Sequence, residues 1–365
     1  MQIALTKKLA DAMGINPPPA QEAENPLFSW TANWTKVWDN RSAEDMLVLV
    51  NNATRFAAAL YQVKRKDLKN VAEMMRASIS NTLLAMSLNP EMVEEYMRLA
   101  GNVEFARNHN RQTAAWVTKA GLECALHVGR EYNDIAKMFS DTIGASTNHY
   151  YVSDPVHNVD FSPDQAMIKA LTELTGKQPY KYRAFELLVT LDLEIYQAMR
   201  RIIVPADLEF SLLHKVLQSV FGWKNYHLYD FTFFGINKHD PVARIVPFED
   251  DLGFDEDAIL MEGHTLSEFL PEYQHMRYTY DFGDNWEHEI QLMRMIEDYD
   301  QESPYLLEAK GQTPPEDVGG VGGFIDFREI MLNPGHSEYK AMREWAKYWN
   351  VELYDWQSRP RVIRV

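Results

Sequence analysis

Apolar residues in the first half of the chain recur with the spacing of helices and of one hairpin. Between residues 68 and 86 they return every four positions, at Val71, Met75, Ile79 and Leu83, which predicts a helix with one buried face. Two apolar runs, residues 46–50 and 56–61, flank a polar turn rich in Asn and predict a β-hairpin. Further helices are expected before Gly14, from Asn89-Pro90 to Leu99, and over residues 112–128. The first half therefore predicts an α+β structure of its own.

Beyond residue 176 the period of the apolar residues changes to two. Residues 185–191 alternate between apolar and other positions over most of their length, which is typical of a half-buried strand. Two helices are expected, one capped by Asp207 with an apolar face over residues 213–220, and one over residues 337–349. The remaining segments predict strands at 200–204, 228–235 and 242–246, and a hairpin of 275–282 with 286–293 around Gly283-Asp284-Asn285.

The length of 365 residues exceeds what one hydrophobic core usually serves, so two domains are expected. The junction is expected within residues 149–182, where one helix signal runs from Ser162-Pro163 to Gly176 between stretches of loop composition. Strands cluster after the junction and helices are few there. The predicted fold is α+β in two domains, residues 1–175 and residues 176–365, and the second is a mostly antiparallel sheet with a few packed helices.

Cysteine content and hydropathy indicate an intracellular protein. Cys124 is the single cysteine, so no intramolecular disulfide can form, which fits a reducing compartment. Its neighbours Leu122, Ala125 and Leu126 favour a core position on a helix over a nucleophile. The first eight residues place their lysines after the apolar run, the reverse of a signal peptide. No stretch approaches the ~18 apolar residues of a membrane span, so we expect a cytoplasmic protein without a membrane partner.

The formal charge of −17 is unevenly distributed. Residues 1–177 carry 18 basic and 20 acidic residues, a net charge of −2, which leaves −15 for residues 178–365. Duplex DNA binding depends on cationic side chains that displace counterions from phosphates, so direct DNA binding by the C-terminal domain is not expected. A nucleic-acid role through the N-terminal half stays open, because Lys64-Arg65-Lys66 and Lys69 form a compact basic group there.

Three segments of the second half carry a family resemblance. They are Leu213-His214 with Phe221-Gly222-Trp223, His227-Leu228 and Phe231; Tyr280-Asp281-Phe282-Gly283-Asp284 with Trp286 and His288; and Pro314-Pro315-Glu316-Asp317 followed by Gly319-Gly320 and Gly322-Gly323. In order and spacing they resemble the plasmid pRiA-type ORF-three-like family, often described as passenger proteins of insertion elements, over residues 178–365. The resemblance implies a mixed α+β domain associated with mobile elements and brings no established activity. Residues 1–175 resemble an N-terminal domain of unknown role that bacterial members carry.

Two positions depart from the family pattern. The chain has Met199 where the family often has tryptophan before the paired arginines, and Val318 where it often has cysteine after the acidic pair. A thiol mechanism or a cysteine-ligated metal at that loop is therefore not expected.

The predicted hairpin contains the first candidate site. In its second strand Trp286 and His288 share one face with two aliphatic residues. His288 could act as a base or metal ligand oriented by Asp281 or Asp284. The alternative is a buried histidine hydrogen-bonded to one of these carboxylates, and we favour it because buried polar groups are usually satisfied.

The Pro/Gly-rich segment, residues 314–323, is the second candidate. Its glycines would let backbone amides approach a ligand, and a following helix would add its positive end. It lacks the Lys-Ser/Thr of a phosphate-binding loop, and Glu316 with Asp317 would repel phosphate, so a cation or an amine suits it better. The alternative is an ordered surface loop. Together the two segments give the candidate ligand-binding residues Tyr280, Asp281, Asp284, Trp286, His288, Glu316, Asp317, Gly319 and Gly320.

A divalent metal is possible on composition, with Asp284, His288, Glu316 and Asp317 as candidate ligands. Five histidines of the second half (His214, His227, His264, His275 and His288) add nitrogen donors, but none has the close His-x-x-x-His spacing of a recognised site. The acidic run 249–257 does not match an EF-hand, because the first and last ligand positions fall on Phe248 and Ile259. We expect a solvated loop there.

Two interpretations of the function remain. The favoured one is a non-catalytic binding or adaptor protein that recognises a protein or a small molecule. The other is a metal-assisted hydrolytic enzyme using Asp281, Asp284, His288, Glu316 and Asp317. They differ in one observable, because an enzyme needs these side chains to converge on a common point that substrate can reach.

Overall fold

The computed structural model describes residues 1–37, 44–130, 141–154, 159–235, 241–254, 258–348, 357–358 and 360–364. The chain divides into two compact units, Met1–Lys181 and Tyr182–Val365, and each is described by itself. The predicted α+β class is confirmed, but the boundary expected at residue 176 stays a prediction about independent folding.

The N-terminal unit is built on a sheet of order β4-β3-β2-β1-β5. Its central strands are antiparallel, whereas β1 pairs in parallel with both β2 and β5. The strands are β1 (Gln2–Leu5), β2 (Ser29–Thr35), β3 (Met46–Asn51), β4 (Ala57–Tyr61) and β5 (Glu104–Arg107). The predicted hairpin, β3 with β4, is confirmed, and every residue of both strands is buried.

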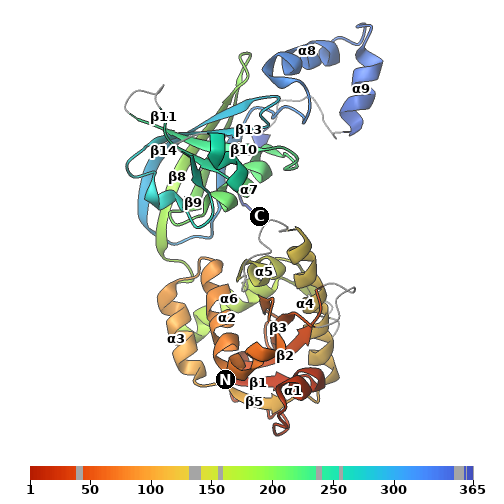
Figure 1. The fold of residues 1–365 in the computed structure, drawn as a ribbon, viewed down its shortest axis with the longest axis vertical. Helices are drawn as coiled ribbons and strands as arrows, with labels where there is room; N and C mark the ends of the chain where they lie inside the picture. Colours follow the sequence, from red (N-terminus) through yellow and green to blue (C-terminus); the bar gives the residue numbers. More distant parts are fainter. Residues whose placement is uncertain are drawn as a thin grey trace. The chain divides into compact units, whose positions relative to one another are not determined.

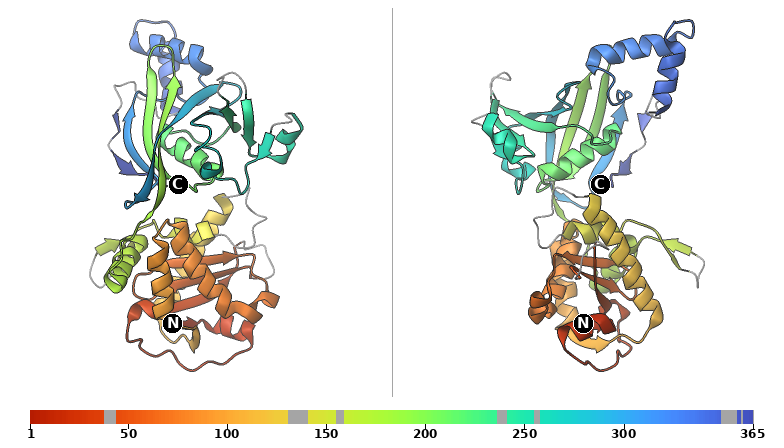
Figure 2. Two further views of the ribbon diagram at one scale, coloured as in Figure 1. Left: turned by 90° about the vertical axis from the view of Figure 1, so that its left-hand side faces the viewer. Right: turned by 45° about the vertical axis from the view of Figure 1, so that its right-hand side comes forward.

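Helices cover both faces of this sheet (Figure 2). On one face α4 packs with Val117 and Cys124 against alternate residues of β3 and β4, and α2 lies against β4 on the other. The helices are α1 (Lys7–Met13), α2 (Val71–Ala85), α3 (Pro90–Ala100), α4 (Arg111–Arg130), α5 (Asp141–Thr147) and α6 (Pro163–Thr175), with 3-10 turns η1 (Pro26–Phe28) and η2 (Arg65–Asn70) and a small hairpin of β6 (Val152–Asp154) and β7 (Val159–Phe161). The helix positions expected from periodicity are confirmed, and burial raises the pKa of the Cys124 thiol to about 12, as expected of a core residue.

The C-terminal unit is one curved sheet of order β12-β11-β10-β13-β14-β8-β9-β15-β16, with β17 also paired to β15 (Figure 1). Among its described strand pairs only β11–β12 is parallel, so the mostly antiparallel prediction is confirmed. The strands are β8 (Tyr182–Asp192), β9 (Gln197–Pro205), β10 (Tyr229–Phe234), β11 (Pro241–Val246), β12 (Ala258–Leu260), β13 (His275–Tyr280), β14 (Trp286–Tyr299), β15 (Tyr305–Lys310), β16 (Gln357–Ser358) and β17 (Arg361–Val362).

Helix α7 (Phe210–Phe221) packs its apolar residues on the inner face of this sheet, where they form one core with inward residues of β8, β10, β13 and β14. Its N-cap is Glu209 and not Asp207 as expected, because the chain first turns at Ala206 and Asp207. Helices α8 (Gly320–Leu332) and α9 (Tyr339–Tyr348) pack on each other as a hairpin (Figure 1). The last residue expected in α9 lies outside the described residues.

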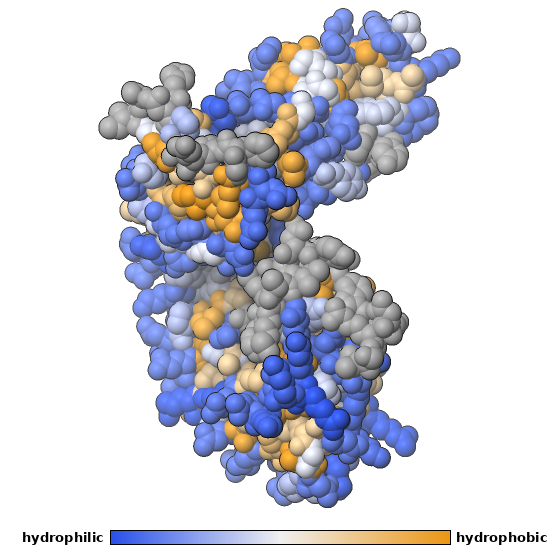
Figure 3. Space-filling view, viewed as in Figure 1, coloured by the Kyte–Doolittle hydropathy of each residue, from blue (hydrophilic) through white to orange (hydrophobic). Residues whose placement is uncertain are grey.

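The acidic run expected as a loop begins with a 3-10 turn, η4 (Glu249–Phe254), and residues 255–257 lie outside the described part. A second turn, η5 (Leu266–Glu268), follows. No helix in the described ranges is both long and apolar enough to cross a membrane. In the face drawn in Figure 3, apolar residues reach the surface in small groups among hydrophilic ones.

Candidate functional site

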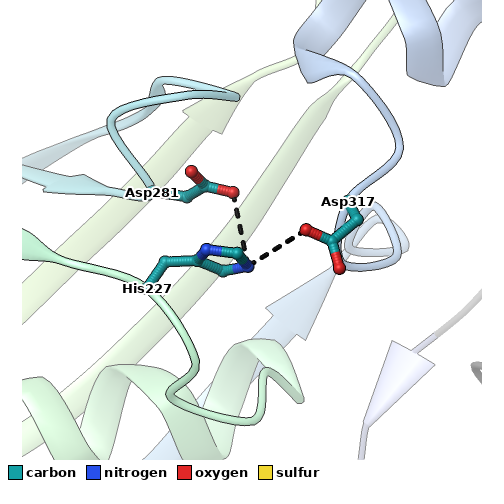
Figure 4. A group of neighbouring side chains, drawn as sticks. All are labelled: His227, Asp281 and Asp317. Carbon is teal, nitrogen blue, oxygen red and sulfur yellow. Dashed lines mark ion pairs between the residues drawn. The ribbon is translucent and has the colours of Figure 1, made fainter.

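Three loops meet at one end of the C-terminal sheet. They are residues 223–228 between α7 and β10, residues 281–285 between β13 and β14, and residues 314–319 before α8. Each belongs to one of the three segments that carry the family resemblance. His227 stands between carboxylates of the other two loops (Figure 4). Its Nε2 lies 3.2 Å from Asp317 Oδ1, 3.6 Å from Asp281 Oδ2 and 3.7 Å from Glu316 Oε2.

The loop that carries His227 is held by α7. The helix ends at Gly222 with a φ of 80°, in the left-handed region that glycine enters without strain. Two buried side chains of α7 then bind Asn225: His214 Nε2 lies 2.7 Å from its Oδ1, and Gln218 Oε1 accepts from its backbone N–H at 2.8 Å. Burial lowers the pKa of His214 to about 4, so this imidazole is neutral. Its role is to hold Asn225 in place through the hydrogen bond. His227 is thereby placed two residues beyond an anchored turn.

Asp281 is oriented by the hairpin turn. Its backbone N–H donates to Leu228 O at 2.9 Å, which joins the turn to the loop of His227. Its Oδ1 accepts from the N–H groups of Gly283 and Asp284 at 2.9 and 3.3 Å. This carboxylate therefore uses one oxygen for the turn and presents the other, Oδ2, to His227.

The third loop is fixed at four points. Arg200 donates to Thr313 Oγ1 at 2.9 Å, and the indole of Trp223 donates to Pro314 O at 3.1 Å. Glu316 Oε1 accepts from Lys224 N–H at 2.7 Å, and Asp284 Oδ2 accepts from Gly319 N–H at 3.1 Å. These bonds join the loop to β9, to the loop of His227 and to the hairpin turn, so the position of Asp317 is set by the fold.

Glu316 and Tyr280 form a buried pair beneath the cluster. The Tyr280 hydroxyl donates to the carboxylate at 3.2 and 3.3 Å. Burial raises the pKa of Glu316, and burial with the neighbouring Glu316 charge raises that of Tyr280. Asp317, by contrast, has a side chain that is 52% exposed. The cluster thus has a buried floor and a side open to solvent.

The cluster has the composition of a cation site. His227, Asp281 and Asp317 each offer a ligand atom, and these atoms lie within 4.8 Å of one another. His227 Nε2 is shielded from solvent and makes no hydrogen bond. Three carboxylates around one imidazole also concentrate negative charge, which attracts a cation.

His288 does not belong to this cluster, and the prediction that it is hydrogen-bonded to a carboxylate was wrong. It lies inward with Trp286, as the alternation predicted, and is fully buried. Its Nδ1 donates to Tyr278 O at 3.1 Å, because both candidate carboxylates are engaged in the turn and at Gly319. The ring packs edge-on against Phe221 and Trp223, and burial lowers its pKa to about 3. The neutral ring serves the core.

Asp284, Gly319 and Gly320 also have structural roles in this arrangement. Asp284 binds the start of α8 through Gly319. Gly320 has a φ of 67°, and a Cβ there would lie 2.8 Å from Asp284 O, so only glycine lets the two loops approach. Trp286 is fully buried in the core under the site.

His227 is the residue that sequence analysis did not single out. From the sequence, His227 was considered only as one of five possible nitrogen donors, although it lies in the first of the three matching segments. The others are placed elsewhere: His214 in the core, His264 beside Glu268 at 2.8 Å, and His275 on β13. Membership of a matching segment was the available signal.

Comparisons with known proteins agree with the resemblance. A family model described as "Plasmid pRiA4b ORF-3-like protein" matches residues 183–358, and one described as "Domain of unknown function (DUF6933)" matches residues 2–166. The chain is 37% identical over 162 residues to "Uncharacterized protein y4hQ" of Sinorhizobium fredii, covering 44% of this chain and 79% of that protein. It is also similar, at 29% identity and a TM-score of 0.40, to a crystal structure of a protein of unknown function from Methanosarcina mazei Go1, over 45% of this chain and 89% of that one.

Proposed function

The chain belongs to the plasmid pRiA4b ORF-3-like protein family, and we propose that its C-terminal domain is a binding module that depends on a divalent cation. The cation is held by His227, Asp281 and Asp317, with Glu316 beside it. The relatives are described only as uncharacterized or of unknown function, so the proposal rests on the geometry of this site.

The observation that carries the proposal is the environment of His227 Nε2. This nitrogen makes no hydrogen bond, yet three carboxylate oxygens lie 3.2–3.7 Å from it. In a tetrahedral metal site with bonds of ~2.0–2.2 Å, neighbouring ligand atoms are about 3.3–3.6 Å apart. The distances from His227 Nε2 are therefore close to those between ligand atoms of one cation, and the ligand atoms of His227, Asp281 and Asp317 all lie within 4.8 Å of one another.

The mixture of donors favours a transition-series cation. Imidazole nitrogen suits Zn²⁺ and related ions, whereas Ca²⁺ takes six to eight oxygen ligands and Mg²⁺ requires near-octahedral oxygen. Three or four protein ligands with one nitrogen among them fit Zn²⁺ or Mn²⁺ better than Ca²⁺. The open side at Asp317 leaves room for a further ligand.

That further ligand distinguishes two uses of the site. In an adaptor associated with mobile elements, a partner protein or a small molecule supplies this further ligand. The cation then joins the partner to the C-terminal domain. A metal-assisted hydrolase is the second candidate, favoured by the exposure of the cluster at Asp317, since catalytic zinc sites combine three protein ligands with a water that the metal makes more acidic. The acidic C-terminal domain argues against duplex DNA as the direct partner.

Calorimetric titration of the full chain, treated with EDTA and exchanged into chelator-free buffer, tests the proposal. We expect one equivalent of Zn²⁺ or Mn²⁺ to bind, with Mg²⁺ and Ca²⁺ much weaker. His227→Ala and Asp317→Asn should each weaken binding at least tenfold. His264→Ala is the matched control, because His264 also pairs with a carboxylate on the same domain but outside the cluster.

Two results would contradict the proposal. One is the absence of stoichiometric cation binding, in which case the cluster is held together by contacts within the protein alone. The other is equal binding by wild type and His227→Ala, which would place the cation elsewhere.

A further inference from the structure

A separate pocket lies in the N-terminal unit, whereas the cation cluster belongs to the C-terminal unit. Its walls come from β3, β4 and the turn between them, from α4, from residues 147–152 at the end of α5 and beyond it, and from Pro163. The cavity measures about 60 Å³, room for roughly four to six water molecules at ~10–15 Å³ each. That is the space a small amino acid or carboxylic acid would fill.

Aromatic rings and an arginine form one side of the pocket. Trp116 of α4 lines it, and the guanidinium of Arg55 stands 4.7 Å from the centre of the indole ring. Tyr150 and Tyr151 also line the pocket and are 45% and 75% exposed. Arg55 also donates to Ser153 O at 2.9 Å, which holds the guanidinium beside the indole ring.

Two residues of opposite charge on α4 line the same pocket. Lys119 and Glu123 both line it and stand one helical turn apart, where side chains face each other. Among the residues that the structure describes, neither Lys119 nor Glu123 forms an ion pair, with the other or with a third group. Lysine placed before glutamate at this spacing is the weaker order for a helix pair, so both charges are available to a ligand.

We propose that this pocket binds a free α-amino acid. Glu123 takes the ammonium group, Lys119 together with Arg55 takes the carboxylate, and the side chain of the ligand packs against Trp116. A zwitterion satisfies both unpaired charges at once, whereas an anion or a cation alone would leave one of them facing a like charge. The apolar walls and the small cavity favour a small neutral side chain, and the site works independently of the cation cluster.

Calorimetry of the full chain with L-alanine, L-serine, sodium acetate and methylammonium chloride tests the proposal. We expect L-alanine or L-serine to bind with one-to-one stoichiometry, at least tenfold more tightly than acetate or methylammonium. Lys119→Met and Glu123→Gln should each weaken amino-acid binding at least tenfold. The matched control is Lys169→Met with Glu173→Gln, an exposed pair on α6 with the same spacing, which should leave binding unchanged.

Thermal melts show whether each variant is folded. Lys119 and Glu123 form no ion pair among the described residues, so neither substitution should lower the melting temperature by more than the control variant does. Three results would overturn the proposal. The first is no binding of either amino acid by wild type. The second is equal affinity for acetate, which would make the pocket an anion site. The third is amino-acid binding that survives both Lys119→Met and Glu123→Gln.

Discussion

The carboxylate of Asp284 accepts a hydrogen bond from the backbone N–H of Gly319 at 3.1 Å, and this bond joins the β13–β14 turn to the start of α8. Each of the two loops also contributes one residue to the cluster: Asp281, three residues before Asp284, and Asp317, two residues before Gly319. The bond therefore sets the distance between two proposed ligands without touching the cation. It also places a negative charge at the positive end of a helix, which is stabilising.

We predict that Asp284→Ala lowers stability by about 0.5–2 kcal/mol, as loss of a helix-capping side chain does. It should also weaken cation binding while one site per chain is retained, because the third loop loses one of its four anchors. Chemical denaturation and calorimetric titration measure the two effects, with Asp284→Asn as the conservative variant that keeps an acceptor oxygen. A loss of cation binding in Asp284→Ala as large as that in Asp317→Asn would make Asp284 a ligand instead.

His288→Ala should cost roughly 2–4 kcal/mol of unfolding free energy, from a cavity between Phe221 and Trp223 and a carbonyl of Tyr278 left without its donor. Since His288 lies outside the cluster, the variant should keep its cation stoichiometry. The measurement is a denaturation midpoint for wild type and variant, each with and without a chelator. An unchanged midpoint in the variant, with a chelator effect seen only in wild type, would show instead that His288 is a metal ligand.

Glu316 should make stability depend on pH when a chelator keeps cations away. Burial raises its pKa in the folded state above the ordinary value of 4.5, so the folded chain binds the proton more tightly than the unfolded chain. The free energy by which this tighter proton binding stabilises the fold is fully present below the unfolded pKa. It is lost as pH rises through the folded pKa. Glu316→Gln cannot ionise, so its stability relative to wild type should increase from about pH 4.5 upward. Denaturation midpoints at pH 4 to 8 test this, and a constant difference between the two proteins would disprove it.

The C-terminal unit should fold without the N-terminal one, because its core is formed by its own strands and helices. A fragment of residues 177–365 is expected to melt in one cooperative transition. A fragment that shows no such transition, while the full chain does, would contradict the two-domain division.

The same fragment should not bind duplex DNA at physiological salt, because its acidic residues repel phosphate. Fluorescence anisotropy with a labelled duplex measures this at two salt concentrations. Submicromolar binding that weakens steeply with added salt would reveal a basic surface on this domain.

Local patterns in the sequence were enough to predict much of the secondary structure. The four-residue spacing of α2, the hairpin of β3 and β4, and the inward side of β14 were all predicted, because each depends on residues close together in the chain. The parallel strand β1 was not predicted. Its partners β2 and β5 are distant in the chain, and a four-residue run does not indicate which strands it will pair with. The prolines and glycines of residues 314–323 indicated an ordered loop, whereas residues 320–323 form the first turn of α8, and the pattern did not show what the loop would contact.

The sequence alone determined that three segments of the second half would matter and which donor atoms they carry. Only the tertiary structure decided that His227, and not His288, stands among the carboxylates. Alternation along β14 turns His288 into the core, where its neighbours are aromatic rings and a backbone carbonyl. His227 reaches Asp281 and Asp317 because α7 anchors Asn225 and because Asp284 binds Gly319. Those contacts join loops that are distant in the chain, so their physical origin is the packing of the whole domain.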